Sequence, residues 1–300
     1  MDVTKRATIV TDNPVVAPIG EMQLNAEGIL KMMDWVGAHR PECLPAEFDP
    51  GVPSWMQLYP HDLKQDGRRL SSNELLVELA GRKCYDSFGL RAGKKSNAEY
   101  IANTQAGEVP HASILYHAKM SFFIAGVSRR VSHELIRNYV GADRDEEGNP
   151  SQESTRFTHH YGWYIAHPYL LNLPGIDRRS ELARFAVAMQ DNYNAYLDFV
   201  QRRFEEFEKT HGAPPKGLDR KRVYESASAY LSHACETSFI WTTNPMALAK
   251  LFRERDNESA DLEFQRLARV WKGVCLQHWP NLFPQPWMQP QGQGEIGRQS

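Results

Sequence analysis

The chain has 300 residues, of which 41% are hydrophobic, so it can bury a sizeable core in one or two domains. Its formal net charge of −2 excludes the general basic field that nucleic-acid-binding proteins usually carry. The four cysteines lie far apart and form no CxxC pair, which argues against a zinc site or a disulfide framework. No signal-peptide core and no run of membrane-spanning length is present. We therefore expect a cytoplasmic protein without a metal site, and with neither nucleic acid nor a membrane as its partner.

Residues 1–70 are predicted to form an irregular N-terminal extension that packs on the core. Within it, Asn25 and Glu27 begin a helical pattern that continues to about Val36, with apolar residues on one face. The stretch 41–66 contains repeated prolines, which exclude a continuous helix or strand. We interpret this stretch as a loop held on the core by its aromatic residues. An active-site lid is the less favoured interpretation.

Residues 71–283 are predicted to form the main domain, and residues 284–300, rich in proline, glutamine and glycine, to form a flexible tail. An apolar run predicts a strand at 120–125 that ends at a Gly-Val-Ser break, and a β-branched and aromatic run predicts another at 237–243. Capping residues and apolar periodicity predict helices at 72–85, 97–105, 128–139, 178–209, 220–235, 245–255 and 262–278.

Three histidines lie among aromatic residues after the first of these strands, namely His159, His160 and His167. A metal cluster is one interpretation of this group. Packing or hydrogen bonding within an aromatic-rich region is the interpretation that we favour.

The densest polar chemistry lies between Val109 and Phe157. Four arginines gather there around one strand–helix junction, at positions 129, 130, 137 and 156, together with serines and histidines. Such groups bind phosphate well. On its own, the helix 128–139 also fits a solvated polar face, but the Ser-x-x-Ser-x-Arg segment at 151–156 favours a phosphate cradle. No dinucleotide-binding, P-loop, GxSxG or HExxH motif is present, so the site must be built from side chains on separate elements.

Several segments carry, in consistent order, a resemblance to a known family. They read GRKCYDS at 81–87, HASILYHA at 111–118, HELIR at 133–137, SQESTRF at 151–157 and FIWTTN at 239–244. This pattern resembles the flavin-dependent thymidylate synthases (the ThyX family) over residues 72–280.

The resemblance implies an α+β fold with a central, mostly antiparallel sheet flanked by helices, in a homotetramer whose active sites lie at subunit interfaces. The reaction that it implies is the reductive C5-methylation of a uridine monophosphate. FAD is the implied cofactor, methylenetetrahydrofolate the carbon donor and NADPH the reductant. No enzyme nucleophile is required, which fits a chain whose cysteines have no activating partner in the sequence.

The resemblance also implies roles for individual residues. The expected catalytic residues are His111, Arg156 and Ser154, although a hydrogen bond to the nucleotide is the safer role for Ser154. The expected cofactor-binding residues are Ser113, Arg137, Asn138, Tyr139, Asn244 and Lys250. The expected nucleotide-binding residues are Glu134, Gln152, Ser154, Thr155, Arg156 and Arg255.

Departures from the family pattern fall on the same sites. The Arg-His-Arg signature reads Arg137-Asn138-Tyr139, Ser228 stands where an arginine that contacts the nucleotide is expected, and Tyr116 stands where glutamate is common. The loop 140–150 is longer and acidic. We hypothesise a specialised paralogue that methylates UMP, alone or alongside dUMP, as in pathways to polyoxin-type nucleoside antibiotics. Exclusive use of dUMP in a turnover assay would exclude this hypothesis.

Two other functions stay open. One is a flavoprotein of this fold with different chemistry, such as an NADPH oxidase-like or hydroxymethylating homologue, which the mass of the product would distinguish. The other is a non-catalytic homologue that binds uridylate without retaining flavin. The altered Arg137-Asn138-Tyr139 signature leaves this second function open, whereas His111, Ser154 and Arg156 argue against it.

Overall fold

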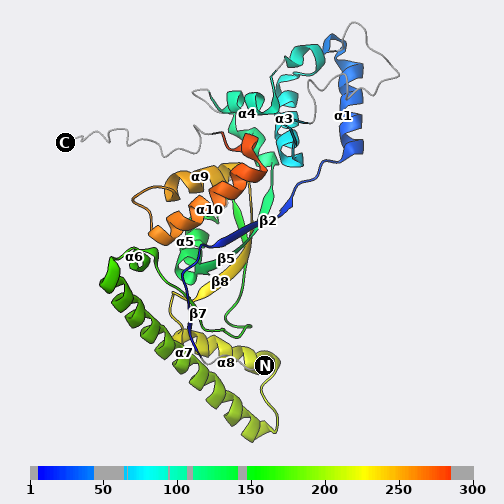
Figure 1. The fold of residues 1–300 in the computed structure, drawn as a ribbon. Helices are drawn as coiled ribbons and strands as arrows, with labels where there is room; N and C mark the ends of the chain where they lie inside the picture. Colours follow the sequence, from blue (N-terminus) through cyan, green and yellow to red (C-terminus); the bar gives the residue numbers. More distant parts are fainter. Residues whose placement is uncertain are drawn as a thin grey trace, which may run out of the picture.

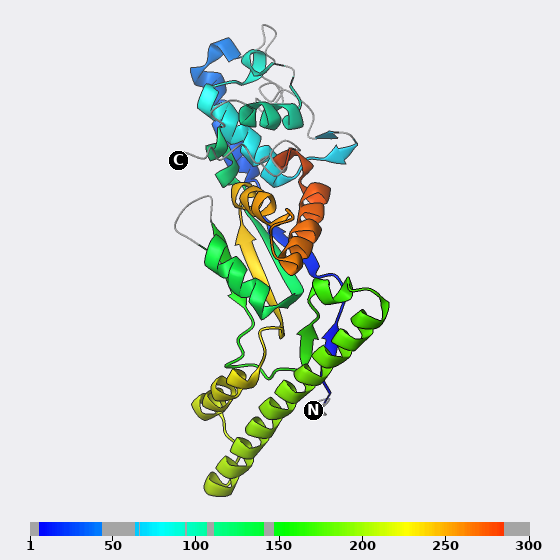
Figure 2. The same cartoon turned by 90° about the vertical axis from the view of Figure 1, so that its left-hand side faces the viewer.

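A four-stranded antiparallel sheet forms the centre of the molecule, with strand order β2-β5-β8-β6 (Figures 1 and 2). The computed structural model describes residues 6–43, 64–65, 67–93, 95–106, 111–140 and 147–284. The strands are β2 (Val15–Glu21), β5 (Met120–Ser128), β8 (Glu236–Thr243) and β6 (Gly148–Gln152). The expected α+β architecture with an antiparallel sheet is confirmed.

One face of this sheet forms the main hydrophobic core. Alternate residues of β5 and β8 point to this face, and the register pairs Phe122 with Trp241 and Ile124 with Phe239. Three helices cover it: α5 (Arg129–Tyr139), α9 (Pro245–Arg255) and α10 (Leu262–His278). Trp271 of α10 lies between the strands and α9, with its ring centroid 5.2 Å from that of Phe122. The opposite face carries exposed apolar side chains at Phe123 and Ile240.

The junction between β5 and α5 differs from the prediction. We expected the strand to end at Ala125, but it continues to Ser128 through a bulge at Gly126, whose φ of +73° favours glycine. Ser128 then N-caps α5, since its hydroxyl accepts a hydrogen bond from the Val131 amide. The strand therefore leads directly into the basic helix.

The N-terminal extension contributes to the sheets, which an irregular segment would not do. β2 is the edge strand beside β5, and β1 (Thr8–Val10) pairs in parallel with β7 (Trp163–Ile165). The sequence hid β2 because Pro18 and Gly20 interrupt its pattern and coincide with an irregularity in its register. The predicted helix is confirmed as α1 (Ala26–His39), capped by Asn25. The proline-rich residues 44–63 and the tail 285–300 lie outside the described residues.

Helices gather at one end of the sheet. They are α1, α3 (Ser72–Tyr85) and α4 (Asn97–Gln105), with short 3-10 turns at η1 (Pro41–Cys43), η2 (Gly89–Ala92), η3 (Ala112–His117) and η6 (Pro280–Leu282) and a small hairpin of β3 (Lys64–Gln65) and β4 (Arg68–Arg69). Capping boxes at Ser71 and Ser96 begin α3 and α4.

The long helix α7 (Gly175–His211) runs along the other end, after the short α6 (Pro168–Leu171). The prediction of a long amphipathic helix is confirmed. The next predicted helix, 220–235, is too long: α8 (Gly217–Ala227) gives way to a 3-10 turn, η5 (Ser228–Tyr230), where the Ser228 hydroxyl donates to the Glu225 carbonyl. No helix of the described residues is long and apolar enough to span a membrane.

Candidate functional site

Three adjoining cavities surround the junction of β5 and α5, with volumes of about 320, 420 and 510 Å³. All three share Arg129 and Thr155 in their walls. Their linings come from α5, from the loop that follows β6, and from the α8–η5 turn. The two larger cavities also share Gln152 and Ser228. Further polar side chains line one or the other of them, namely Ser132, His133, Ser154 and Arg156.

Arg129 is the cation at the centre of these cavities. Its Nη2 donates to the Glu153 carbonyl at 2.7 Å, and its backbone amide donates to the Cys235 carbonyl at 2.9 Å. Its Nε is buried and has no hydrogen-bond partner in the described part of the chain. Burial lowers the pKa of this guanidinium, but an arginine keeps its charge at neutral pH. A partly buried cation with an unsatisfied, buried donor beside a cavity fits an anionic ligand.

The segment 152–156 brings four expected nucleotide-binding residues to the same place. Gln152 is held by two hydroxyls, since its Nε2 donates to Ser132 Oγ at 2.8 Å and to Thr237 Oγ1 at 3.1 Å. Ser154 stabilises the turn, accepting from the Arg156 amide at 3.4 Å. The Arg156 side chain is half exposed and lies 3.6 Å from Glu225 of α8. The loop is thus preformed, with its arginine reaching toward α8.

The expected nucleotide-binding residues Glu134 and Arg255 also meet. Glu134 Oε1 lies 2.9 Å from Arg255 Nη1, so α5 and α9 are joined by an ion pair. Both side chains are largely covered, with 29% and 19% exposure. Arg130, on the same helix, pairs instead with Asp261 and Glu263 at the start of α10.

His111 lies at the opposite end of β5, before η3. The Tyr85 hydroxyl is 2.8 Å from its ring Nδ1, and both residues line a cavity of about 540 Å³ with Lys95 and Tyr100. His111 is exposed, as is Ser113 two residues later. The chain therefore separates the histidine of the expected catalytic set from Ser154 and Arg156.

The remaining expected cofactor-binding residues fall into two groups. Arg137 is exposed, and its side chain has no ion pair or hydrogen bond with any described residue, while Lys250 is half-buried on α9. Asn138 donates to the Glu134 carbonyl at 2.9 Å. Tyr139 and Asn244 are buried, and the structure uses their polar groups for contacts within the chain. The flavin contacts assigned to them stay predictions.

Asn244 shows this most clearly. Its Oδ1 accepts from the Ala247 amide at 2.9 Å as the N-cap of α9, and its Nδ2 donates to Glu147 Oε2 at 2.9 Å. Glu147, which ends the acidic loop, also pairs with Lys119. Burial raises the pKa of the Glu147 carboxyl, but the partners Lys119 and Asn244 outweigh it and leave the pKa below its ordinary value.

The three histidines have the packing roles that we favoured. His160 Nδ1 accepts from the Gly162 amide at 3.0 Å, and its ring packs against Tyr164 and Tyr193. His159 packs on Tyr196, whereas His167 caps α6. Among the described residues, no group of His, Cys, Asp and Glu has the arrangement of a metal site.

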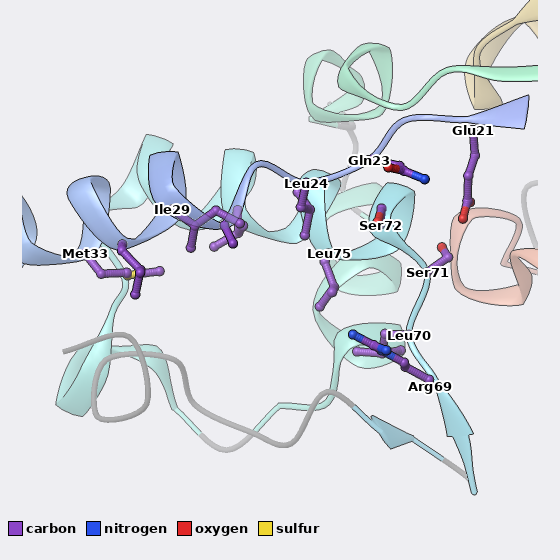
Figure 3. Close-up of a pocket in the computed structure, with 13 residues that line it drawn as sticks. Glu21, Gln23, Leu24, Ile29, Met33, Arg69, Leu70, Ser71, Ser72 and Leu75 are labelled. Carbon is purple, nitrogen blue, oxygen red and sulfur yellow. The ribbon is translucent and has the colours of Figure 1, made fainter. Parts of the chain in front are cut away.

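Another cavity, of about 610 Å³, lies elsewhere, between α1 and α3. Figure 3 shows apolar side chains from both helices at one end, including Ile29, Met33 and Leu75, and polar side chains such as Gln23 and Ser72 at the other. Its acidic residue, Glu21, accepts a hydrogen bond from Trp279 Nε1 at 2.6 Å. Among the residues that line this cavity Arg69 is the one cation, whereas the cavity of about 510 Å³ at the β5–α5 junction has two, Arg129 and Arg156.

Comparison with known proteins identifies the family. A family model described as "Thymidylate synthase complementing protein" matches residues 68–281. A flavin-dependent thymidylate synthase from Mycobacterium avium is 35% identical over 210 residues, which are 70% of this chain and 76% of that protein. One from Corynebacterium efficiens is 31% identical over 214 residues, 70% of this chain and 78% of that protein. The chain therefore belongs to the flavin-dependent thymidylate synthase family.

A solved structure supports the same fold over nearly the whole chain. The UMP/dUMP methylase PolB from Streptomyces cacaoi, bound with 5-Br UMP, superposes with a TM-score of 0.55 at 14% identity, covering 95% of this chain and all of that chain. At this identity the likeness concerns the fold alone. It extends the match to elements outside residues 68–281, including part of the N-terminal extension.

Sequence reasoning counted Arg129 among the four arginines at the strand–helix junction but gave it no role of its own. The signal that identifies Arg129 is positional, because it is the first residue after the N-cap of α5 and its backbone is tied to Cys235. A pattern of side chains alone does not show which of the two adjacent arginines, Arg129 or Arg130, faces the cavity.

The buried His160 predicts a pH dependence of stability. Burial, reinforced by Arg129 and His159, lowers its pKa from 6.5 to about 4. The folded state then binds fewer protons than the unfolded state between these values, so this contribution is complete above pH 6.5 and is lost as the pH falls toward 4. We expect His160 to add up to about 1.4 kcal/mol per pH unit to the loss of unfolding free energy in this window.

Urea denaturation at several pH values measures this contribution. In His160→Asn the dependence of the unfolding free energy on pH should be flatter than in the wild type between pH 6.5 and 4. His211→Asn, at an exposed position near the end of α7, serves as the control. Equal slopes for the wild type and His160→Asn would contradict the assignment.

Proposed function

We propose that this protein catalyses the FAD-dependent reductive C5-methylation of a uridine monophosphate, UMP and/or dUMP, with methylenetetrahydrofolate as carbon donor and NADPH as reductant. The observation that carries the proposal is the group of cavities around Arg129, where a partly buried cation, whose buried Nε has no partner among the described residues, meets the preformed loop 152–156. Family membership supports the type of reaction, and the cavity supports a ligand with a phosphate.

The residues divide the work of binding. Arg129 and Arg156 supply the positive charge for a phosphate, and Arg156 would exchange its exposed contact with Glu225 for the ligand. Gln152 and Thr155 supply hydrogen bonds, with Gln152 already oriented by two hydroxyls. Arg255 and Glu134 supply a donor and an acceptor that suit the polar edge of a uracil. The protein thereby positions the base and contributes no nucleophile.

FAD fits the residues that remain available. The exposed Arg137 guanidinium has no partner among the described residues and suits the flavin diphosphate, while Ser113 offers an exposed hydroxyl. When bound, FAD would carry hydride from NADPH to the transferred carbon. The Tyr85–His111 pair would orient the groups around it, because the phenol fixes the ring of the histidine.

The separation of the two halves of the site supports an oligomer, and we propose the homotetramer of the resemblance. His111 lies beyond the Met120 end of β5, whereas Arg129 follows the Ser128 end. The nine residues of β5 span roughly 30 Å at about 3.3 Å per residue. One chain therefore does not bring His111 to its own Arg129, and a site that uses both takes them from different subunits.

The decisive experiment has two stages. The visible spectrum of the purified protein with FAD is recorded without oxygen before and after NADPH, and we expect a flavin band that bleaches. Turnover of UMP and dUMP with methylenetetrahydrofolate is then compared, with the 5-methyl product identified by mass. Protein that takes up no FAD yet binds uridylate would support the non-catalytic alternative, and an unmethylated or hydroxymethylated product would support different flavin chemistry.

If Arg129 binds the phosphate, its removal should weaken the binding of nucleotide. Removal of its charged donors in Arg129→Ala should raise the Kd of the preferred uridylate about ten- to a hundredfold, measured by calorimetry. Arg222→Ala is the control, because Arg222 lies on the neighbouring α8, is exposed and pairs only weakly with Asp219 at 4.0 Å. An unchanged Kd in Arg129→Ala would place the phosphate elsewhere.

A site that takes His111 and Arg129 from different subunits predicts complementation between two inactive variants. His111→Ala and Arg129→Ala, each inactive alone at a limiting uridylate concentration, should regain turnover when co-expressed and purified as mixed oligomers through two tags. Mixed oligomers then contain sites in which both residues are native. Inactive mixed oligomers would indicate that each chain supplies both residues to its own site.

A further inference from the structure

Arg255 is held on several sides in a way that its role in nucleotide binding alone does not require. Its guanidinium lies over the ring of Phe264, with its central carbon 5.1 Å from the centroid, and 5.7 Å from the ring centroid of Tyr139. Its Nη1 pairs with Glu134 at 2.9 Å, and its Nε donates to the Tyr139 hydroxyl at 3.0 Å. Among the described residues, none hydrogen-bonds Nη2. Nη2 of the Arg255 guanidinium is therefore available to a ligand.

Tyr139 is the residue that holds the Arg255 guanidinium in its orientation, through the hydrogen bond from Nε. The residue is 2% exposed, at the last turn of α5, and its hydroxyl donates to Glu254 Oε2 at 2.6 Å. A phenol has one proton, so the proton directed to Glu254 leaves the oxygen lone pairs for Arg255 Nε. Burial, aided by Glu254, raises the pKa of Tyr139, which keeps the phenol protonated throughout the physiological range. The chain Glu254–Tyr139–Arg255 thus has one consistent set of donors and acceptors.

The arrangement connects three helices that cover the same face of the sheet, in addition to the ion pairs of Arg130 with Asp261 and Glu263 at the start of α10. Glu254 and Arg255 are neighbours at the end of α9, whereas Tyr139 belongs to α5 and Phe264 to α10. The Tyr139 ring is itself fixed, with its centroid 6.2 Å from that of Phe264.

We propose that Tyr139, oriented by Glu254, is a positioning residue that aims Arg255 at the bound nucleotide, and that it does not itself contact the flavin. This inference rests on the proposed function for the role of Arg255. It replaces the flavin contact expected for Tyr139, because the side chain lies in the core and its hydroxyl is used on both sides.

The test is Tyr139→Phe, which removes one oxygen and keeps the ring in the core. In FAD-saturated protein we expect the Kd and KM of the preferred uridylate to rise about tenfold, as the loss of one hydrogen bond to a charged group predicts. The Kd of FAD should change less than twofold. Tyr164→Phe is the matched control, because Tyr164 is equally buried but belongs to the separate core cluster under α7.

The measurements separate the possible roles. An increase in nucleotide Kd with a thermal midpoint like that of Tyr164→Phe supports positioning. A nucleotide Kd equal to that of the wild type overturns the inference, whatever the thermal midpoint, and weaker FAD binding with unchanged nucleotide binding would restore the flavin contact. Wild-type protein that binds neither UMP nor dUMP would refute the proposed function instead. Glu254→Gln keeps an acceptor for the phenol, so its nucleotide Kd should rise less than that of Tyr139→Phe.

Discussion

The buried carboxylate of Glu263 fixes the junction on which the site depends. It accepts the Ser128 amide at 2.7 Å and the Ser128 hydroxyl at 2.9 Å, and it pairs with Arg130 Nη2 at 2.9 Å. The end of β5 and the first turn of α5 are thereby tied to α10, at a carboxylate that is almost fully covered. Three charge-assisted contacts offset the cost of burying that charge. Arg129 lies between Ser128 and Arg130, which are both held by Glu263. Its own side chain lines the cavities.

This constraint explains why the cation is preorganised without a ligand. Ser128 and Arg130 lie on one side of the helix start, and the Arg129 backbone is bonded to Cys235 on the neighbouring segment. The entropy of ordering the arginine is therefore lost during folding and not during binding. At Ser228 the wall of the cavity carries a small hydroxyl residue where the resemblance leads one to expect an arginine. Arg129 and Arg156 are the arginines in the walls of these cavities, and under the proposed function they supply the positive charge for a phosphate.

The sequence predicted those parts of the fold that have strong local patterns. The helices α7, α9 and α10 follow from apolar periodicity and, for α9, from the cap Asn244, and the strand β8 follows from its β-branched and aromatic residues. The edge strand β2 was missed because its pairing with β5, a contact distant in sequence, overrides the local effects of Pro18 and Gly20. Helix α8 was extended too far because the turn at Ser228 depends on one side-chain bond to the Glu225 carbonyl.

In the candidate site too, local sequence patterns predicted positions, whereas contacts between distant residues were not predicted. Motif positions pointed to the loop 152–156 and, separately, to Glu134 and Arg255, which the structure brings together in an ion pair. What each side chain contacts could not be read from spacing. Tyr139 and Asn244 occupy positions assigned to the flavin, yet one is a core phenol and the other a helix cap. Burial and partner choice are properties of the tertiary structure, so a motif assigns a position and not a contact.

The departures from the family pattern are physically connected to one another. Where the acidic loop returns to the sheet, Gly148 packs so closely that a Cβ would lie 2.7 Å from the Tyr139 carbonyl oxygen and overlap the indole of Trp241. The preceding Glu147 holds the amide of Asn244, and its carbonyl accepts from the Thr243 hydroxyl at 2.6 Å. Tyr139, which stands at the last position of the Arg-His-Arg signature, therefore packs against Gly148 at the end of the acidic loop. Glu147 at the same loop end is hydrogen-bonded to Asn244, the N-cap of α9. Because α9 carries Arg255 at its other terminus, a change in the loop and a change at Tyr139 act on the same helix.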